Sequence, residues 1–562
     1  MSLAAARVAP RAVRIDLAVE FNWRRSDAGA ATIWFAGHCY GDGEARLRRA
    51  AQAGDAAALI RLLPELDGHF ACAIDAGAFV LAATDPIASI PLFIAETDDP
   101  AQRHAVDARA PRLAARCGLA TPDADAVREL AMAGFTIGDR TLYRGLTQMR
   151  PGEYALWRGA DLERRRYHIY RPWRVRERPA KMLHAELAEL LDTLFRKLAG
   201  DLGGRMAVIP LSAGLDSRLI AAGLRHAGYR NVRCFAYGKP GNFEAEASRR
   251  IAGKLGYDWR FVATTPASQR AFFASTIAAE FKSFADTLAG IPFQQDYDAL
   301  RRLAESGFVP RDAVVINGQS GDYITGNHIP EKLSVPAPEG TSDDERWQRI
   351  LDAAVAKHFA LWRHLMTPDN VARVQKRLRH ELREIGAALG APALDYALYE
   401  QSEYDHRQAR YVVQGQRSYE HQGYDWRMPL WDRALIDFFE AAPLSAKRAQ
   451  ALYRETLEAL DWGGVWRGIA VNRKTIRPLW LAFARMLAKF AIAPRGRAAW
   501  HDVERRWFAY PMDNLSSYAA VPYASVRRDR RGFRNAFSWH VEAYLAAKGI
   551  PLDAAIGAAE AS

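Results

Sequence analysis

The sequence predicts an α/β protein of several domains, in which an N-terminal α+β sandwich precedes a doubly wound parallel sheet with a helical C-terminal part. The chain has 562 residues, more than the ~100–200 residues of an ordinary domain. Short strands broken by glycine and aspartate dominate up to about residue 170, and strands alternate with helices from about residue 180. We therefore predict domains at residues 1–175 and 176–480 and a helical extension at 481–562.

The N-terminal region is predicted to be rich in strands, because alternating, β-branched and aromatic residues lie between turn residues. The strands are expected at Ala31–Gly37, Gly68–Ile74, Ala78–Ala83 and Glu153–Trp157. Two helices are expected among them, at about Glu44–Ala53 and Asp125–Ala133. Strands with few helices between them are typical of an α+β sandwich.

The second region has a different secondary-structure pattern, in which predicted helices and short apolar strands alternate. Helices are expected at Ala180–Leu202, Arg218–Ala227 and Glu244–Leu255, and strands at Ala207–Leu211, Val232–Tyr237 and Trp259–Val262. This alternation implies a parallel, doubly wound sheet. The proline-rich segment Pro330–Pro338 is interpreted as a loop, and most of the remaining chain as helix.

Composition excludes several functional classes. Hydrophobic residues make up 49% of the chain, which favours packed cores over disorder. The four cysteines are widely spaced, which argues against a disulfide framework or a zinc site and fits a reducing compartment. The net charge is +12, but no aromatic-interleaved basic motif accompanies it. We therefore expect no nucleic-acid partner.

A membrane span is not expected either, because no apolar stretch reaches ~18 uninterrupted residues. Pro478–Pro494 comes closest, but Arg485 and Lys489 interrupt it. We interpret it as an ordinary amphipathic helix rather than a helix on a membrane surface. Met1–Arg14 lacks the apolar segment of a signal peptide, so a cytoplasmic location is predicted.

The most informative segment is Leu211-Ser212-Ala213-Gly214-Leu215-Asp216-Ser217, which follows an apolar strand and opens a helix. Backbone N–H groups and the positive helix end converge there, so the loop can hold an anion. Ser212 and Ser217 add hydroxyl donors, and Gly214 allows close approach of the backbone. Asp216 would repel a phosphate, but it suits a Mg²⁺ ion that bridges phosphates.

This segment resembles the Ser-Gly-Gly-x-Asp-Ser pyrophosphate loop of ATP pyrophosphatases, with Ala213 in place of the middle glycine. Later segments resemble the asparagine synthetase family in particular. Tyr237 ends a strand where that family contacts adenine, and Ile316–Asp322 resembles its Ser-Gly-Glu-Gly-x-Asp segment. Tyr424–Asp432 resembles its Glu-x-Arg-x-Pro-Phe-Leu-Asp segment, and Asn472-Arg473-Lys474 its late lysine loop.

The resemblance implies a HUP-like ATP pyrophosphatase domain that uses ATP and Mg²⁺. It implies catalytic roles for Asp216, Gln319, Asp322 and Lys474, with the two aspartates holding the metal. It places the nucleotide against Leu211, Ser212, Gly214, Ser217, Tyr237, Asn317 and Gly318. Gln319 stands where asparagine synthetases carry a glutamate, which argues against ordinary asparagine synthesis.

Further residues are expected around the acyl group. Tyr411, Tyr419 and Glu420 lie in a segment expected to line its pocket, and each is a candidate base. His328 is expected to be exposed, and no partner at ligand spacing suggests that it binds a metal.

The N-terminal half resembles a class II glutaminase domain and hence an Ntn-hydrolase-like sandwich. The resemblance rests on Leu66–Ala71, Thr84-Asp85, Pro91–Phe93, Leu142–Leu146 and Pro151-Gly152. A working glutaminase needs an N-terminal cysteine as nucleophile. This chain begins Met1-Ser2-Leu3, its first strand is expected near Val13, and the family's oxyanion Asn-Gly aligns with Ala36-Gly37. We therefore predict a degenerate domain without glutamine hydrolysis.

The resemblance as a whole implies an AMP-forming amide ligase that activates a small-molecule or peptide carboxylate for attack by ammonia or an amine. Arg218 and the sequence of residues 318–328 resemble the asparagine synthetase-like proteins of surface-polysaccharide pathways, which favours a sugar acid as substrate. Lactam closure, as in β-lactam synthetase, carbapenam synthetase and lasso-peptide cyclases, stays open, as does a non-catalytic ATP-binding scaffold. The N-terminal half argues against a nucleic-acid-modifying enzyme. The sequence does not choose the substrate or nitrogen donor, and it leaves a homodimer open.

Overall fold

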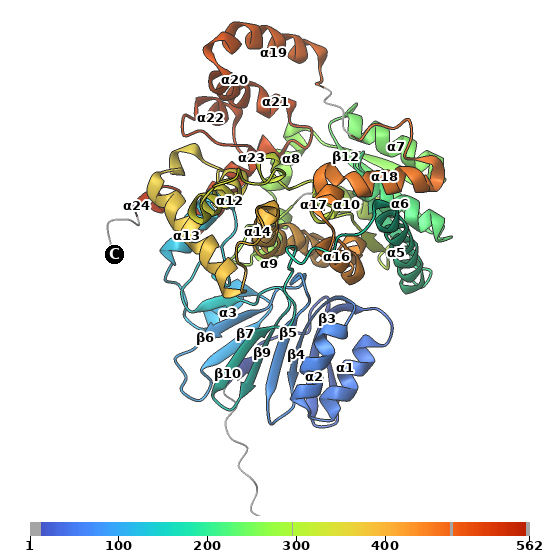
Figure 1. The fold of residues 1–562 in the computed structure, drawn as a ribbon, viewed down its shortest axis with the longest axis vertical. Helices are drawn as coiled ribbons and strands as arrows, with labels where there is room; N and C mark the ends of the chain where they lie inside the picture. Colours follow the sequence, from blue (N-terminus) through green and yellow to red (C-terminus); the bar gives the residue numbers. More distant parts are fainter. Residues whose placement is uncertain (1–12, 295, 472–475, 558–562) are drawn as a thin grey trace, which may run out of the picture. The chain divides into compact units, whose positions relative to one another are not determined.

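The computed structural model describes residues 13–294, 296–471 and 476–557, and these divide into two compact units (Figure 1). The first unit holds the described residues up to Ala126 together with Thr136–Ile169 and Asp286–Gly290. The second holds Val127–Phe135, Tyr170–Ala285 and the described residues from Ile291 onward. The helices of residues 481–557 therefore belong to the second unit.

The first unit contains two sheets. The larger has the strand order β10-β9-β5-β4-β3-β2 and is antiparallel throughout. Its strands are β2 (Trp23–Ala28), β3 (Ala31–Cys39), β4 (Gly68–Asp75), β5 (Val80–Thr84), β9 (Glu153–Arg158) and β10 (Asp161–Arg166). The smaller has the order β1-β7-β6-β8, with β1 (Val13–Ile15), β6 (Phe93–Glu96), β7 (His104–Asp107) and β8 (Leu146–Gln148).

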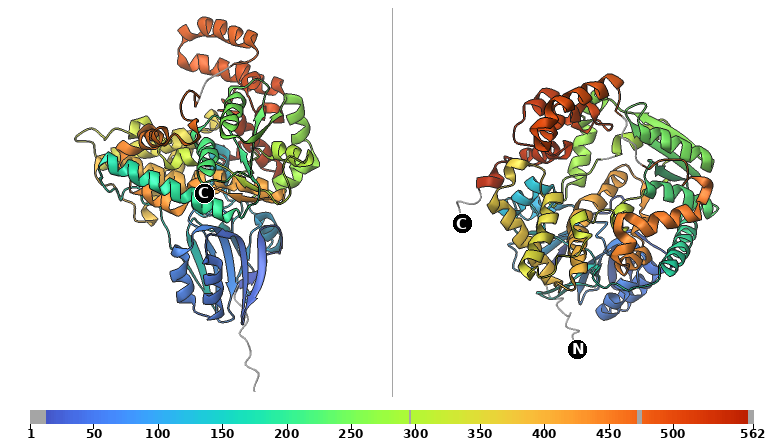
Figure 2. Two further views of the ribbon diagram at one scale, coloured as in Figure 1. Left: turned by 90° about the vertical axis from the view of Figure 1, so that its right-hand side faces the viewer. Right: turned by 45° about the horizontal axis from the view of Figure 1, so that its top comes forward.

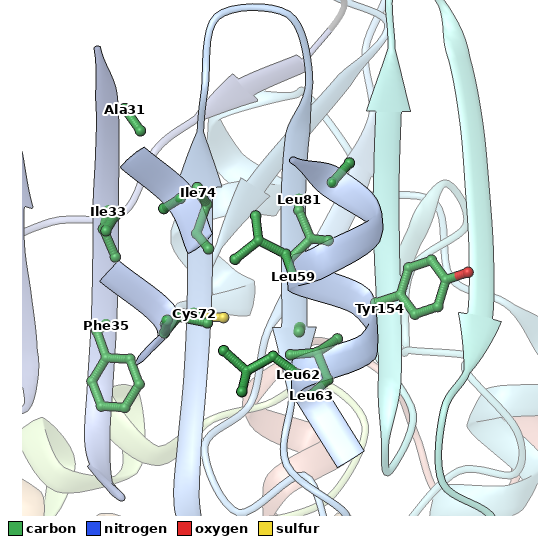
Figure 3. Close-up of a cluster of buried hydrophobic side chains, with 14 of the residues drawn as sticks. Ala31, Ile33, Phe35, Leu59, Leu62, Leu63, Cys72, Ile74, Leu81 and Tyr154 are labelled. Atoms are coloured by element: carbon green, nitrogen blue, oxygen red, sulfur yellow. The ribbon is translucent and has the colours of Figure 1, made fainter. Parts of the chain in front are cut away.

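Both faces of the larger sheet are covered. On one face, Phe70, Cys72 and Ile74 of β4 share a buried cluster with Leu59 and Leu62 (Figure 3). The two leucines lie on α2 (Ala56–Leu62), which runs beside α1 (Gly43–Gln52). The first unit also contains the short 3₁₀ helix η1 (Leu63–Glu65) and the helix α3 (Ala110–Arg116). Side chains on a strand alternate between faces, so the buried alanines between these β4 residues face the opposite way.

The opposite face packs against the smaller sheet. The ring of His104 on β7 lies 6.2 Å from that of Trp157 on β9. Each predicted strand and helix of this region is present within about two residues, which confirms the two-sheet α+β prediction.

Leu59 tests the core beneath the helices, because its side chain is completely buried between α2 and the sheet. Leu59→Ala is expected to lower the free energy of unfolding by about 2–5 kcal/mol, since it removes apolar contacts and leaves a cavity. Urea denaturation followed by far-UV circular dichroism measures this loss. Leu59→Met keeps the volume and is expected to cost less than about 1.5 kcal/mol. Equal losses in the two variants would contradict this packing.

The second unit is built on a five-stranded sheet with the order β13-β12-β11-β14-β15, and all of its pairs are parallel. The strands are β11 (Ala207–Pro210), β12 (Val232–Gly238), β13 (Asp258–Ala263), β14 (Val314–Ile316) and β15 (Asp425–Arg427). The helix α5 (Ala180–Asp201) precedes β11 in the sequence, α6 (Leu215–His226) lies between β11 and β12, and α7 (Phe243–Leu255) lies between β12 and β13. The predicted doubly wound parallel sheet is confirmed.

The order of these strands defines the position of a binding site. From β11 the chain adds β12 and then β13 on one side, and it later returns to place β14 on the other side of β11. In open α/β sheets, ligands bind outside the carboxyl ends of strands at such a switch point. Here the loops after β11 and β14 meet at that edge.

The remainder of the second unit is helical, as predicted. Its α-helices are α4 (Ala124–Ala133, shared with the first unit), α8 (Pro266–Phe273), α9 (Thr276–Ala285), α10 (Tyr297–Glu305), α11 (Gly321–Ile324), α12 (Asp343–His358), α13 (Pro368–Glu384), α14 (Asp395–Glu403), α15 (Arg417–His421), α16 (Arg433–Glu440), α17 (Leu444–Lys447), α18 (Ala451–Leu460), α19 (Leu479–Ile492), α20 (Arg497–Val503), α21 (Tyr510–Met512), α22 (Tyr523–Arg528), α23 (Ala536–Ala547) and α24 (Ala554–Gly557).

Two stretches of this region wind more widely, as π-helix: η5 (Tyr404–Val412) and η11 (Glu504–Ala509). The predicted loop Pro330–Pro338 contains one short 3₁₀ turn, Glu331–Leu333. None of the helices in the described ranges combines the length and the hydropathy that crossing a membrane requires.

Candidate active site

The loop after β11 forms an open cradle at the start of α6. Ser212 N–H donates to Ser217 Oγ at 3.0 Å, and Gly214 N–H donates to Ser212 Oγ at 3.1 Å. Gly214 is the N-cap residue of α6 and has no side chain to cover the first N–H groups of the helix. The first N–H groups of α6 and the positive end of the helix therefore face the loop, where an anion can accept hydrogen bonds from these N–H groups.

Arg218, completely buried one turn into α6, ties this loop to a distant segment. Its Nη2 donates to Ala213 O at 2.6 Å and its Nη1 to Ile469 O at 3.1 Å, with Val465 O and Ala470 O at 3.3 Å. Burial lowers the pKa of this guanidinium to about 10, so it stays charged at neutral pH. One cation thus fixes the loop to the chain just before residues 472–475.

The segment after β14 packs directly onto the start of α6, and two glycines make this possible. A Cβ on Gly318 would lie 2.8 Å from Asp216 C and Ser217 N, and one on Gly321 would lie 2.6 Å from the Asp216 carboxyl carbon. Real side chains do not approach that closely. Glycine is therefore required at both positions for the two loops to touch.

This contact brings Asp216 and Asp322 together. The backbone N–H of Asp322 donates to Asp216 Oδ2 at 2.8 Å, and Tyr453 OH on α18 donates to Asp216 Oδ1 at 3.2 Å. Burial, and then the negative charge of Asp322, raise the pKa of Asp216 to about 8. Two carboxylates from neighbouring loops at one edge of the sheet favour a cation between them.

His328 lies behind this pair, and the expectation that it is exposed was wrong. Its side chain is 15% exposed, its Nε2 lies 3.1 Å from Asp322 Oδ2, and its Nδ1 bonds Glu403 on α14. Burial alone would lower the pKa of His328, but the charges and hydrogen bonds of Glu403 and Asp322 outweigh it and raise the pKa to about 9. A cationic His328 in turn holds the pKa of Asp322 below its usual value, against the effect of burial. Local spacing could not reveal Glu403, which lies 75 residues away in sequence.

These loops enclose a cavity of about 450 Å³. Of the predicted site residues, Leu211, Ser212, Gly214, Asp216, Ser217, Tyr237, Asn317, Gly318, Gln319 and Asp322 all line it. Lys474, the remaining one, lies outside the described residues. Glu244, Asp296, His328 and Arg407 also line the cavity and were not among the predicted site residues.

The expected acyl-pocket segment divides in two. Tyr411 and Tyr419 line the cavity, and Tyr419 OH accepts from Asn317 at 3.2 Å and donates to Asp296 Oδ2 at 2.7 Å. Burial raises the pKa of Asp296 to about 6, although the hydrogen bond from Tyr419 opposes it. Glu420 is instead buried away from the cavity, in an ion pair with Arg417 at 2.7 Å. The interpretation of Glu420 as a lining residue and candidate base was wrong.

A second cavity of about 600 Å³ adjoins the first and shares Tyr237, Phe293, Tyr411 and Leu515 with it. Its walls are mostly aromatic and apolar, and none of the described residues that line it is a lysine or an arginine. Further aromatic lining residues are Phe272, Phe273, Tyr518, Phe537 and His540. Within the described residues, the polar atoms Thr264 Oγ1 and Gln294 Oε1 are buried at its wall without a hydrogen-bond partner.

Part of the chain that contains this site matches a known protein family. Residues 205–460 match the family described as asparagine synthase. The match identifies an asparagine synthase-like domain in this part of the chain, which supports a relationship to ATP-dependent amide ligases. The matched range contains both loops, both aspartates and all five strands of the parallel sheet. A comparison with curated proteins found no match.

Two solved structures of purine biosynthesis enzymes also match part of the chain. One is glutamine phosphoribosylpyrophosphate amidotransferase from B. subtilis complexed with ADP and GMP, at 14% identity and a TM-score of 0.18, over 48% of this chain and 77% of that one. The other is described as the allosteric regulatory enzyme of purine biosynthesis, at 12% identity and a TM-score of 0.17, over 43% and 61%. Superposition at these TM-scores gives no information about the fold of this chain.

Gly318 offers a test of the contact between the two loops. Gly318→Ala is expected to weaken Mg·ATP binding by more than about tenfold, because the new methyl group meets rigid backbone and forces the loops apart. Titration calorimetry measures the affinity. Gly253→Ala in α7, where an added methyl group meets nothing within 4 Å, is the matched control and is expected to bind like the wild type. Unchanged affinity in Gly318→Ala would show that the loops do not need this contact.

Proposed function

We propose that this protein is an AMP-forming amide ligase, which activates a carboxylate with ATP and joins it to ammonia or an amine. One observation carries the proposal: an uncapped helix start and two carboxylates from neighbouring loops face a single cavity at the switch point of a parallel sheet. This is the arrangement that a nucleotide triphosphate with its metal ion requires.

The residues present fit Mg·ATP. Phosphate oxygens would accept from the loop Ser212–Ser217, and adenine would lie against Leu211 and Tyr237. The described residues contain no group of three or more acidic, histidine or cysteine side chains that could hold a metal alone. Mg²⁺ commonly binds to one or two carboxylates together with substrate phosphates, and Asp216 and Asp322 would supply these. When bound, the ion neutralises phosphate charge.

In the first step, a carboxylate oxygen of the substrate attacks the α-phosphorus, and the bond from that phosphorus to pyrophosphate breaks. The products are an acyl-adenylate and pyrophosphate. We propose that Lys474 stabilises the charge of the departing pyrophosphate. The anchoring of Val465, Ile469 and Ala470 by Arg218 supports this role, because it fixes the chain just before the lysine segment to the phosphate loop.

In the second step, the nitrogen attacks the acyl carbon, AMP leaves, and a proton of the amine must be accepted. The amide of Gln319 cannot accept it as a carboxylate would. We propose Asp296 instead, reached through Tyr419 OH, which donates to it at 2.7 Å. The pKa of Asp296, raised by burial to about 6, suits a base near neutral pH.

The second cavity is proposed to hold the acyl body of the substrate. Its aromatic rings can stack on a sugar ring or on apolar side chains, which leaves a sugar acid favoured and a peptide that closes a lactam as the alternative. Because its described lining has no lysine or arginine, a sugar nucleotide would have to keep its diphosphate outside. The substrate is therefore expected to enter this cavity with an uncharged body.

Glutamine is not proposed as the nitrogen source. Burial raises the pKa of the Cys72 thiol to about 12 and also raises the pKa values of Cys39 and Cys117, so none of the three described cysteines of the first unit presents a reactive thiolate. Ser2 lies outside the described residues. Free ammonia or an amine would then be the nucleophile.

The first test is ATP–pyrophosphate exchange with aspartate, free uronic acids, uronic-acid sugar nucleotides and a peptide pool. One class is expected to support exchange, and Asp322→Asn is expected to reduce it by more than about 100-fold because it removes a carboxylate of the metal site. Asp312→Asn, on an exposed aspartate outside the cavity, is the matched control and is expected to keep full exchange.

Asp296→Asn separates the two steps. It is expected to keep pyrophosphate exchange within a few-fold of the wild type and to lose amide formation, measured by mass spectrometry of the product. Loss of exchange in Asp296→Asn would overturn its role as acceptor. Tight Mg·ATP binding without exchange for any acid in the panel would favour a non-catalytic ATP-binding scaffold.

A further inference from the structure

The helix α19 (Leu479–Ile492) displays a row of large apolar side chains to solvent. The exposed residues recur at the spacing of one helix face: Leu479 (68% exposed), Trp480 (67%), Phe483 (58%), Met486 (44%), Leu487 (52%) and Phe490 (74%). No other helix in the described ranges exposes so many large apolar residues. Single exposed apolar residues are normal on proteins, but a continuous patch marks an interaction site.

The opposite side of α19 is already occupied. Leu481 is buried with Trp500 and Phe508, and Ala484, Ala488 and Ile492 pack against the same cluster. Figure 2 (left) shows the orange-red helix of these residues at the far end of the second unit, beside the helices that hold that cluster. The helix thus carries large apolar side chains on its exposed side as well as its buried one, which an ordinary amphipathic helix, as predicted for this segment, would not do. Helices that are apolar all round normally lie within a core or in lipid.

The charges around this face are of one sign. Residues 476–501 contain five arginines and lysines and no acidic residue. Arg485 pairs with Glu504 of the neighbouring helix, whereas Arg477, Lys489, Arg495 and Arg497 are exposed. An apolar face bordered by exposed cations is complementary to a surface that combines apolar and anionic groups.

A bilayer with anionic lipids fits this face better than a protein does. A second copy of the chain would oppose one cationic border to another, which is repulsive. Protein interfaces carry about one hydrogen bond per 100–200 Å², and apart from the indole N–H of Trp480 the six side chains of this face have no hydrogen-bonding group. Lipid requires no such bonds.

We propose that α19 inserts its outer face into the interface of an anionic membrane and holds the ligase there. Its 14 residues span about 21 Å, less than the ~30 Å of a hydrocarbon core, so it lies in the plane of the interface. Tryptophan and phenylalanine are suited to that depth, and exposed cations beside it meet the lipid headgroups.

Vesicle flotation of the full chain tests the proposal, with phosphatidylcholine vesicles that contain or lack 30% phosphatidylglycerol. The wild type is expected to float with the anionic vesicles and to stay largely bound in 1 M NaCl, because apolar insertion is not screened. The variant Leu479→Ser/Phe483→Ser/Phe490→Ser is expected to lose at least about tenfold in partition coefficient. All three side chains are exposed, so the fold should be kept.

The matched control is Val19→Ser/Met182→Ser/Val335→Ser, which removes three exposed apolar residues elsewhere and is expected to float like the wild type. Complete release of the wild type by salt would overturn insertion. Equal flotation of the two triple variants would also overturn it, as would failure of the wild type to float. If light scattering shows that the wild type is a dimer and the α19 variant a monomer, and the wild type does not bind vesicles, a second copy of the chain covers the face. Pyrophosphate exchange by the α19 variant in the absence of vesicles is expected to match the wild type, so this test stands apart from that of the ligase.

Discussion

The site depends on the close contact between the start of α6 and the segment after β14. Two glycines allow this contact: a Cβ on Gly318 would clash with the backbone of Asp216 and Ser217, and one on Gly321 with the side chains of Leu430 and Asp216. The contact forces Asp216 and Asp322 together, which is unfavourable for two carboxylates and raises the pKa of the buried one. A cation bound beside the pair would favour the ionised form of Asp216. Two carboxyl groups placed in this way before any ligand binds are suited to a metal–phosphate ligand.

The parallel sheet makes this contact possible. Asp216 and Asp322 are far apart in the sequence, but β11 and β14 are neighbours in the sheet, and both loops leave its carboxyl edge. Behind them, His328 and Glu403 set the charge of Asp322, while Arg218 fixes the phosphate loop to residues 465–470. Each of these partners comes from a different helix or loop of the unit. The sheet sets the position of the acidic pair, and the surrounding helices set its electrostatics.

A feature could be predicted from the sequence when all of its residues lie in one short segment of the chain. The phosphate loop is continuous, and strand, loop and helix can be identified from one segment, so its residues were found together. The pairing of His328 with Glu403 and of Tyr419 with Asp296 depends on packing between segments more than 70 residues apart, and no local pattern encodes it. The helix α19 was predicted by its periodicity. Its exposure was not, because periodicity tells which residues share a face and not what covers that face.

The two cavities divide the chemistry between the family domain and the segment that follows it. Every residue of the smaller cavity except Leu515 lies within 205–460, the range that matches the asparagine synthase family. The larger cavity also takes Met512, Asp513, Leu515, Tyr518, Phe537 and His540 from beyond that range. In the proposed function, activation by ATP would be a property of the shared domain, whereas the C-terminal helices would help to select the acid. The same C-terminal segment carries α19, so the proposed substrate cavity and the proposed membrane contact both depend on residues outside the matched domain.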